Sequence, residues 1–478
     1  MRTSVKFRIP EPGTTTPETA EPFLRRHRMD ILVVLAMGIL LYIGVSWQIF
    51  KVYPDAAKYQ CYAVAFWQGT PALRPLPWQQ CYFLAHPGTS FISTATIVKT
   101  MQMYGLPAPL IQFVAGQSPH QPLHALPYEY PLPTIIPFTL GLVAPPGWYQ
   151  VAFAVWMSLV AALMYVLLLH FKSRKAAIVC AFYLVVGGWG TAGGRFDLVP
   201  SVLVLAAILC AIRKRWNWAF ALLALATVLK FYPLVLIIPF LIAQQTESGD
   251  KWLTRRRFAP LGTFVTVCAA VMALSLFLSV EGTLAPLSYF ENRPFQIESV
   301  ATSVLWLLSF LGYPLHPEFS YGSLNVVSSL APQVSFVNSL FSCIGLFYVW
   351  WLQWRGKADL VVTCLLTLLI VIVTGKVFSP QYLIWIVPLA AYIGESNPKW
   401  VVSWSVLGLL TTMIYPYLYT APGSLMAVPG LPLFYPTVAA RNLLFLAIIV
   451  ALLFYHSHKQ PTYPARSFYP LKRWEKKS

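Results

Sequence analysis

The sequence is poor in charged residues and lacks the short motifs of several large enzyme classes. Only 10% of its 478 residues are charged, whereas a soluble domain carries about 25%. No G-x-x-x-x-G-K-[ST] motif is present, so an ATP-driven pump is not supported. The Asp-x-Asp, G-x-S-x-G and H-E-x-x-H patterns are also absent. The sequence therefore offers no metal-bound nucleotide-sugar site, no hydrolase elbow and no metalloprotease site.

The chain is instead rich in apolar residues. Hydrophobic residues make up 57% of the chain and mean hydropathy is +0.62. Runs of roughly 18 or more apolar residues recur along its length, which is typical of a polytopic membrane protein. Basic clusters alternate with these runs, so the net charge of +18 reflects the positive-inside rule and not a nucleic-acid partner. We predict an all-α, multi-pass cell-membrane protein with about 12 transmembrane helices and both termini cytoplasmic.

The predicted topology divides the chain into a membrane domain, residues 30–455, and two cytoplasmic tails. The tails are a disordered segment, 1–29, and a basic one, 456–478. A large first extracytoplasmic loop, 51–147, is broken by prolines and holds an amphipathic stretch, Thr89 to Gly105, that we expect along the membrane surface. A second large loop covers 281–330. Cys61 and Cys81 both lie in the first loop, where pairing stays open.

Twelve apolar segments are the predicted spans. They are Asp30–Phe50, Trp148–Phe171, Ala176–Trp189, Leu198–Ile212, Trp216–Lys230, Phe231–Ala243, Phe258–Val280, Ala331–Leu352, Asp359–Gly375, Leu383–Ile393, Trp400–Tyr419 and Thr437–Tyr455. The apolar stretch between Pro133 and Pro145 is too short to cross comfortably, and we expect it to be re-entrant or interfacial. With this topology nine of the 34 Lys and Arg residues lie outside, as the positive-inside rule demands.

Few carboxylates remain on the outer side for acid–base chemistry. Those present are Asp55, Glu129, Asp197, Glu281, Glu291, Glu298 and Glu318. Asp55 follows Pro54 and opens a helical segment, so it is equally a helix cap or a general base on sequence alone. Asp197 could bind a metal or an acceptor, or cap the helix that begins at Leu198. His316, in the second loop, is either solvated or a hydrogen-bonding group for substrate.

Four basic residues stand at the outer ends of apolar spans. They are Arg195, Lys230, Lys376 and Arg441. Charged groups against apolar spans are costly and are functional-site hypotheses by default. Together they could hold one phosphate, but each could equally snorkel alone to the interface.

Several segments of the sequence form recognisable motifs. The first is Asp55 with Tyr59, Gly69 and Pro71, followed by Tyr130-Pro131-Leu132-Pro133, and it resembles the start of the membrane glycosyltransferases of the C-type (GT-C) fold. GGRFDLVPSVLVLAAIL at 193–209, LKFYPLVLIIP at 229–239 and VFSPQYLIWIVPL at 377–389 resemble the polyprenol-phosphate-mannose-dependent branch, glycosyltransferase family 87. The resemblance covers roughly residues 30–395.

The resemblance implies an inverting hexosyltransferase whose donor is a polyprenyl phosphate carrying a sugar, with mannose expected. The acceptor would be a hydroxyl of a glycolipid or lipid-linked glycan at the extracytoplasmic face. It implies Asp55 as general base and the four basic residues as donor-phosphate ligands. Acceptor and substrate contacts are expected from Tyr59, Glu129, Tyr130, Asp197, His316 and Gln381. No cofactor or metal ligand is predicted, although Asp55 and Asp197 leave a divalent ion open.

A transporter or flippase for lipid-linked sugars is the alternative from another class. Such a protein is expected to carry ionisable groups near the bilayer midplane, discontinuous helices and internal repeats. Here the charges gather at one face beside a large loop, which favours the enzyme. The short segments Trp216–Lys230 and Phe231–Ala243 are the feature that fits the transporter best.

Overall fold

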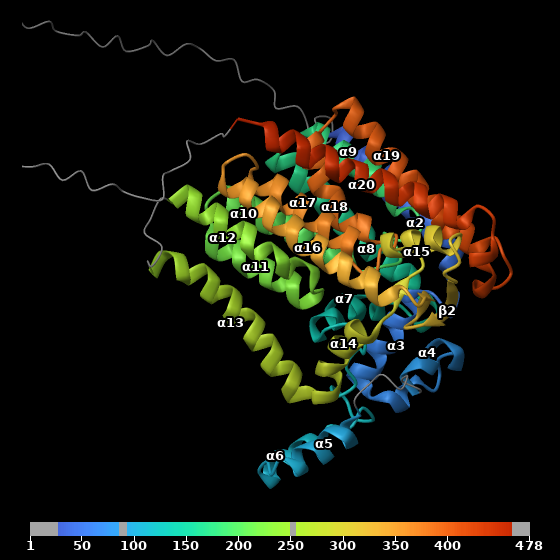
Figure 1. Ribbon diagram of the computed structural model, residues 1–478. Coiled ribbons are helices and arrows are strands. Elements are labelled where there is room, and N and C mark those ends of the chain that lie inside the picture. Colours follow the sequence, from blue (N-terminus) through green and yellow to red (C-terminus); the bar gives the residue numbers. More distant parts are fainter. Residues whose placement is uncertain (1–26, 86–92, 249–254, 461–478) are drawn as a thin grey trace, which may run out of the picture.

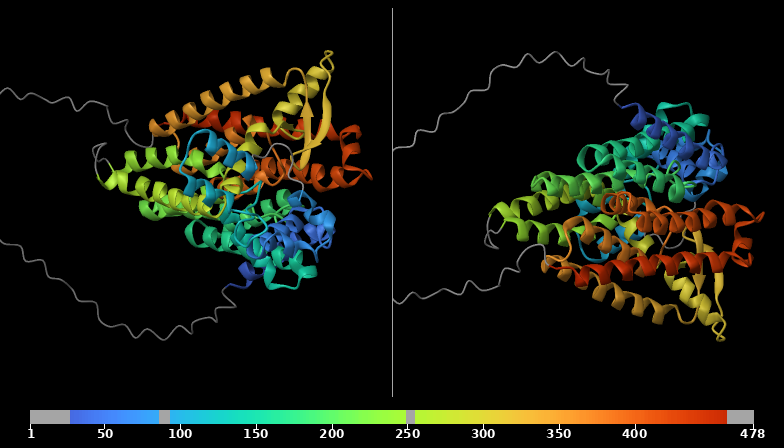
Figure 2. Two further views of the ribbon diagram at one scale, coloured as in Figure 1. Left: turned by 90° about the horizontal axis from the view of Figure 1, so that it is seen from below. Right: turned by 90° about the horizontal axis from the view of Figure 1, so that it is seen from above.

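The computed structural model describes residues 27–85, 93–248 and 255–460. Most of the two predicted tails, and residues 89–92 of the predicted amphipathic stretch, lie outside the described residues. The helices run between the two ends of an elongated bundle, and the first-loop helices and a small sheet share one of these ends (Figures 1 and 2).

Each of the twelve predicted spans corresponds to a helix. These are α2 (Arg28–Val45), α8 (Tyr149–Phe171), α9 (Arg174–Gly188), α10 (Leu198–Ile212), α11 (Trp216–Leu229), α12 (Ile237–Ser248), α13 (Arg255–Leu278), α16 (Ala331–Trp354), α17 (Leu360–Thr374), α18 (Tyr382–Gly394), α19 (Pro398–Thr412) and α20 (Phe434–His458). A 3₁₀ turn, Tyr232–Leu236, precedes α12, and a turn of π-helix, Met413–Leu418, follows α19.

The helices fall into long ones and short ones. Six of the described helices are long and apolar enough to cross a membrane: Arg28–Gln48, Pro146–Phe171, Phe258–Leu278, Ala331–Trp354, Pro398–Leu418 and Phe434–His458. The long α16 exposes large apolar side chains such as Phe336 (72%) and Phe347 (68%). The short α17 is buried along nearly its whole length, including Leu365 and Leu369. Apolar side chains on all sides suit a helix enclosed by other helices, so α17 forms part of the bundle interior.

The described residues of the predicted first extracytoplasmic loop, 51–147, are mostly helical. It holds α3 (Asp55–Gln68), α4 (Trp78–Ala85), α5 (Thr94–Met103), α6 (Ala108–Ala115) and α7 (Ile135–Thr139). A disulfide between Cys61 and Cys81 joins α3 to α4. The apolar stretch around α7 does not cross the bundle but packs on α3, and Phe138 is fully buried.

The second loop corrects the all-α expectation. It contains α14 (Val280–Asn292), β1 (Phe295–Gln296), α15 (Val300–Ser309), β2 (His316–Ser320) and β3 (Ser323–Val327), with the strands antiparallel in the order β1-β3-β2. Tyr321 and Gly322 form a two-residue hairpin turn in which both φ angles are positive, 51° and 65°. That geometry matches the twist of antiparallel strands. The sequence did not indicate the strands because they are at most five residues long and prolines stand in or before two of them.

Candidate active site

Two ion pairs lie at the ends of helices from different parts of the chain. Asp55, the first residue of α3, forms an ion pair with Arg195 in the α9–α10 connection. Asp197, at the N-terminus of α10, forms an ion pair of 2.5 Å with Lys230, the residue that ends α11. Neither carboxylate makes a helix-capping hydrogen bond. The structure therefore favours charge pairing over the capping alternative for both aspartates.

The α9–α10 connection owes its position to glycines. A Cβ atom on Gly190 would lie 2.8 Å from Pro416, and one on Gly193 would lie 3.0 Å from a methyl of Val45. Gln48 of the turn after α2 also donates a hydrogen bond of 2.6 Å to the Gly190 carbonyl. Residues without side chains allow this segment to pack tightly on α2. Arg195 is thereby carried toward the start of α3.

The paired groups are sheltered from solvent without being sealed. Side-chain exposure is 15% for Asp55, 21% for Arg195 and 13% for Lys230, and only 1% for Asp197. Burial alone would raise the pKa of the Asp55 carboxyl, but the positive charges of Arg195, Lys58 and Lys230 outweigh it and hold the pKa below its ordinary value. Asp55 is thus ionised at neutral pH and able to accept a proton.

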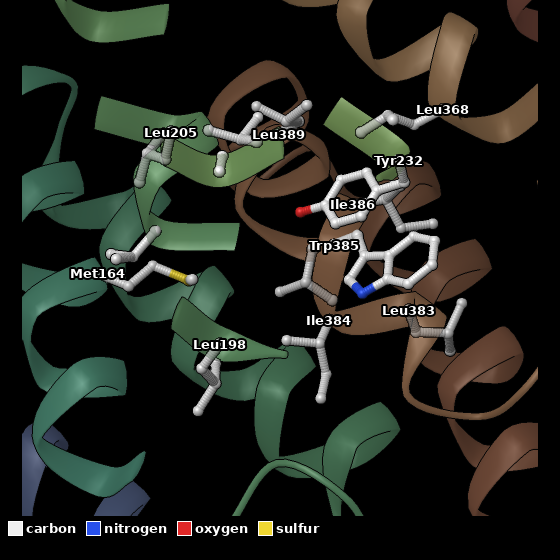
Figure 3. Close-up of a cluster of buried hydrophobic side chains, with 14 of the residues drawn as sticks. Met164, Leu198, Leu205, Tyr232, Leu368, Leu383, Ile384, Trp385, Ile386 and Leu389 are labelled. Carbon is white, nitrogen blue, oxygen red and sulfur yellow. The ribbon is translucent and has the colours of Figure 1, made fainter. Parts of the chain in front are cut away.

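Aromatic rings enclose the Lys230 end of the cluster. Trp385 donates a hydrogen bond of 2.6 Å to Asp197 and stacks on Tyr232, with ring centroids 4.1 Å apart. Tyr382 also stacks on Trp385, with ring centroids 3.8 Å apart. The Lys230 ammonium lies 5.1 Å from the Trp385 centroid and 5.8 Å from that of Tyr382. Beneath, Tyr232 and Trp385 sit among apolar side chains of the bundle core (Figure 3).

The predicted tyrosines Tyr59 and Tyr130 belong to an aromatic cluster under Asp55. Tyr59 is 1% exposed and stacks on Phe138 at 4.1 Å. Tyr130 lies edge-on to Phe196, with centroids 5.2 Å apart, and edge-on to Tyr59. Phe196 stands between Arg195 and Asp197 in the chain, so the packing of its ring on Tyr59 and Tyr130 fixes the backbone that carries both ion-paired residues.

Glu129 lies close to the tip of the β2–β3 hairpin. Its carboxylate is 3.9 Å from the Lys58 ammonium. A Cβ on Gly322, at the hairpin tip, would lie 3.2 Å from that ammonium and 3.6 Å from the Glu129 oxygen. The Tyr289 hydroxyl donates to the Tyr321 carbonyl and holds the tip in place. The hairpin therefore covers the Lys58–Glu129 pair.

The other predicted residues are spread around this region. Lys376 is exposed and donates a hydrogen bond of 3.0 Å to the Glu291 carbonyl at the end of α14. Gln381 is buried just before α18 and contacts the Ser379 hydroxyl. His316 begins β2 and is exposed. The structure does not bring His316 to the ion pairs by any described contact.

Arg441 is fully buried inside α20. Its guanidinium contacts the Glu298 carboxylate at 3.4 Å, the side chain of Asn442 at 2.9 Å and the ring of Phe378 at 3.9 Å. Tyr419 donates a further hydrogen bond of 2.8 Å to Glu298. With no exposed surface, Arg441 has the contacts of an internal ion pair that ties α20 to the second loop. We leave it out of the phosphate site proposed below.

Sequence reasoning did not single out Tyr289, Arg293, Tyr382 or Trp385. Arg293 follows α14, and its guanidinium donates a hydrogen bond of 2.7 Å to Ser323 on the hairpin. Trp385 lies within the VFSPQYLIWIVPL motif, so the motif contained the signal but not the role. No group of three or more His, Cys, Asp or Glu that could hold a metal ion occurs among the described residues.

The Asp197–Lys230 ion pair lies within a segment that matches a known protein family. Residues 128–380 match glycosyltransferase family 87. The chain belongs to that family. The matched segment includes Arg195, Asp197, Lys230 and Lys376, whereas Asp55 precedes it and joins the site through its ion pair with Arg195. No curated protein matches the sequence. The chain is thus a membrane glycosyltransferase of family 87, which implies lipid-linked substrates.

Proposed function

We propose that this family 87 glycosyltransferase moves a hexose, specifically mannose, from a polyprenyl phosphate to a hydroxyl of a glycolipid or lipid-linked glycan at the outer membrane face. The observation that carries the proposal is the paired cluster of Asp55, Arg195, Asp197 and Lys230 at the ends of apolar helices. A lipid donor can lie beside such helices while its phosphate reaches the cations. The same cluster supplies a carboxylate for the acceptor.

Asp55 acts as general base in the proposed reaction. Its carboxylate takes the proton of the acceptor hydroxyl as that oxygen attacks the anomeric carbon of the donor. The bond from this carbon to the phosphate oxygen breaks, and the electron pair leaves with the polyprenyl phosphate. One carboxylate suffices for direct displacement with inversion, whereas hydrolysis by a glycosidase employs a fixed pair.

Arg195, Lys230 and Lys376 hold the donor phosphate and stabilise the charge that grows on it. Arg195 is paired with Asp55 before substrate arrives. Arginine also binds phosphate through two parallel hydrogen bonds. On donor binding, Arg195 therefore shares its charge between Asp55 and the phosphate, and the carboxylate becomes a stronger base when the acceptor is in reach. Asp197 and Trp385 orient Lys230, and Glu129 with Tyr130 faces the acceptor.

This exchange predicts different pH profiles for kcat/KM and kcat. The kcat/KM profile reports the free enzyme, in which Arg195 holds the pKa of Asp55 below its ordinary value. Its acid limb should therefore lie below the usual aspartate range, and activity should be lost only as the pH falls through that lowered pKa. The kcat profile reports the substrate complex, and its acid limb should lie at a higher pH than the acid limb of kcat/KM. In initial rates from pH 4 upward, kcat/KM should therefore stay level down to pH 4 while kcat already falls; coincident acid limbs would contradict the exchange.

The direct test of the proposed function is transfer by purified protein in detergent. Protein incubated with radiolabelled polyprenyl-phosphate mannose and a polar-lipid extract as acceptor should produce a new labelled glycolipid. A flippase would give no such product in detergent, where only one compartment exists, but would move labelled donor across the bilayer of a proteoliposome. Absence of transfer together with such movement would replace the enzyme by the transporter.

A further inference from the structure

Arg293 is a basic residue near the site that has no carboxylate partner among the described residues, unlike three other basic residues there. The other three have carboxylate partners, in the pairs Asp55–Arg195, Asp197–Lys230 and Glu129–Lys58. Within residues 27–85, 93–248 and 255–460, no carboxylate lies within ion-pair distance of Arg293. Its positive charge is therefore not cancelled by a carboxylate, a feature that it shares with Lys376, whose ammonium donates to a backbone carbonyl.

The guanidinium of Arg293 also has hydrogen-bonding capacity to spare. Its Nη2 donates to the Ser323 hydroxyl at 2.7 Å, but its Nε is buried and has no hydrogen-bond partner. Buried N–H groups in folded proteins nearly always find an acceptor. A guanidinium presents five N–H donors in a rigid fork, which matches the oxygens of a phosphate. The orphaned Nε therefore points to an anionic ligand.

Arg293 stands beside the residues of the candidate active site. Its guanidinium carbon lies 5.6 Å from the centroid of the Tyr289 ring. Burial and the negative charge of Glu129 raise the pKa of Tyr289, the Arg293 charge opposes that rise, and Asp55 adds to it, so these charges share one neighbourhood. Lys376 donates to the carbonyl of Glu291, two residues before Arg293. Arg293 and Lys376 therefore flank the same end of α14.

We propose that Arg293 binds the phosphate of the polyprenyl-phosphate donor, and then that of the lipid phosphate released after transfer. This inference rests on the proposed function and adds to it a phosphate ligand outside the four predicted basic residues. Ser323 orients the guanidinium from the hairpin, and the Nε edge faces the phosphate oxygens. Arg293 thereby connects donor binding to the position of the hairpin that covers Glu129.

The test measures binding of farnesyl phosphate to the full-length protein in detergent, with farnesol as the neutral counterpart. Wild-type protein should prefer farnesyl phosphate, and Arg293→Gln should weaken its binding about tenfold to a hundredfold without changing farnesol binding. Arg293→Lys, which keeps the charge but loses the fork, should fall between them. The same Gln variant should raise the KM for the donor by a similar factor and leave the KM for the acceptor unchanged.

Ser323→Ala is the matched control, because it removes the hydrogen bond to the hairpin and keeps the guanidinium. It should weaken farnesyl phosphate binding far less than Arg293→Gln; equal losses would make Arg293 a hairpin anchor and overturn the inference. Inorganic phosphate should compete weakly, and competition equal to that of farnesyl phosphate would assign Arg293 to a free anion instead. Unchanged binding in Arg293→Gln refutes this inference alone. A wild-type protein that does not distinguish farnesyl phosphate from farnesol refutes the proposed donor class itself.

Discussion

Replacing Asp55 by Asn is expected to lower kcat by about 10²–10⁴-fold, the contribution of a positioned general base. The amide has nearly the shape of the carboxylate and can still accept a hydrogen bond from Arg195, but it cannot take the proton of the acceptor hydroxyl. Rates of mannose transfer by the purified variant, at saturating donor, give the measurement. The protein should still fold, because Asp55 and Arg195 both keep some contact with solvent, at 15% and 21% side-chain exposure, and the amide preserves the shape of the site.

Binding distinguishes loss of the base from general damage to the site. With Asp55 neutral, Arg195 is no longer shared, so Asp55→Asn should bind farnesyl phosphate as tightly as the wild type or more tightly. Glu291→Gln, which neutralises an exposed acid at the end of α14, is the control and should keep the wild-type rate. A wild-type rate in Asp55→Asn would place the base elsewhere, and weaker lipid-phosphate binding would indicate that Asp55 is structural.

The helices could be predicted because membrane spans impose a length and a composition on the sequence. The limits of α10, Leu198–Ile212, coincide with the predicted span, since a basic cluster and a carboxylate mark its ends. Boundaries moved where the chain continues past the apolar run, as in α16, which extends to Trp354. The number of membrane crossings stays a prediction, because several helices are shorter than a bilayer requires.

The partners of the charged residues could not be predicted from their positions in the sequence. Arg195 and Arg441 both stand beside apolar spans, and the sequence treats them alike. In the structure, Arg195 meets Asp55 at a partly exposed site, whereas Arg441 is enclosed with Glu298. The difference arises from contacts between segments more than a hundred residues apart, which no local pattern encodes. Arg293 was not singled out for the same reason, since only the folded structure shows which basic residues have a carboxylate partner and that Arg293 has none among the described residues.

Removing the charge of Lys230 has the second large expected effect, on stability as well as on activity. Lys230→Met keeps the length of the side chain but leaves the Asp197 carboxylate, 1% exposed, with Trp385 as its remaining donor. Breaking one side of a buried ion pair costs about 3–5 kcal/mol. We expect a clear fall in the thermal unfolding midpoint in detergent, together with loss of transfer. Lys99→Met, at an exposed position of α5, should leave the midpoint unchanged.

The double variant Lys230→Met/Asp197→Asn separates the two effects. It removes both charges together, so no uncompensated ion remains, and a buried pair replaced as a whole often leaves stability unchanged or improved. The unfolding midpoint should therefore return toward the wild-type value. Transfer should stay low, because the phosphate still lacks the Lys230 charge. Recovery of both stability and activity would make the Asp197–Lys230 pair purely structural, and phosphate binding would then fall to Arg195, Arg293 and Lys376.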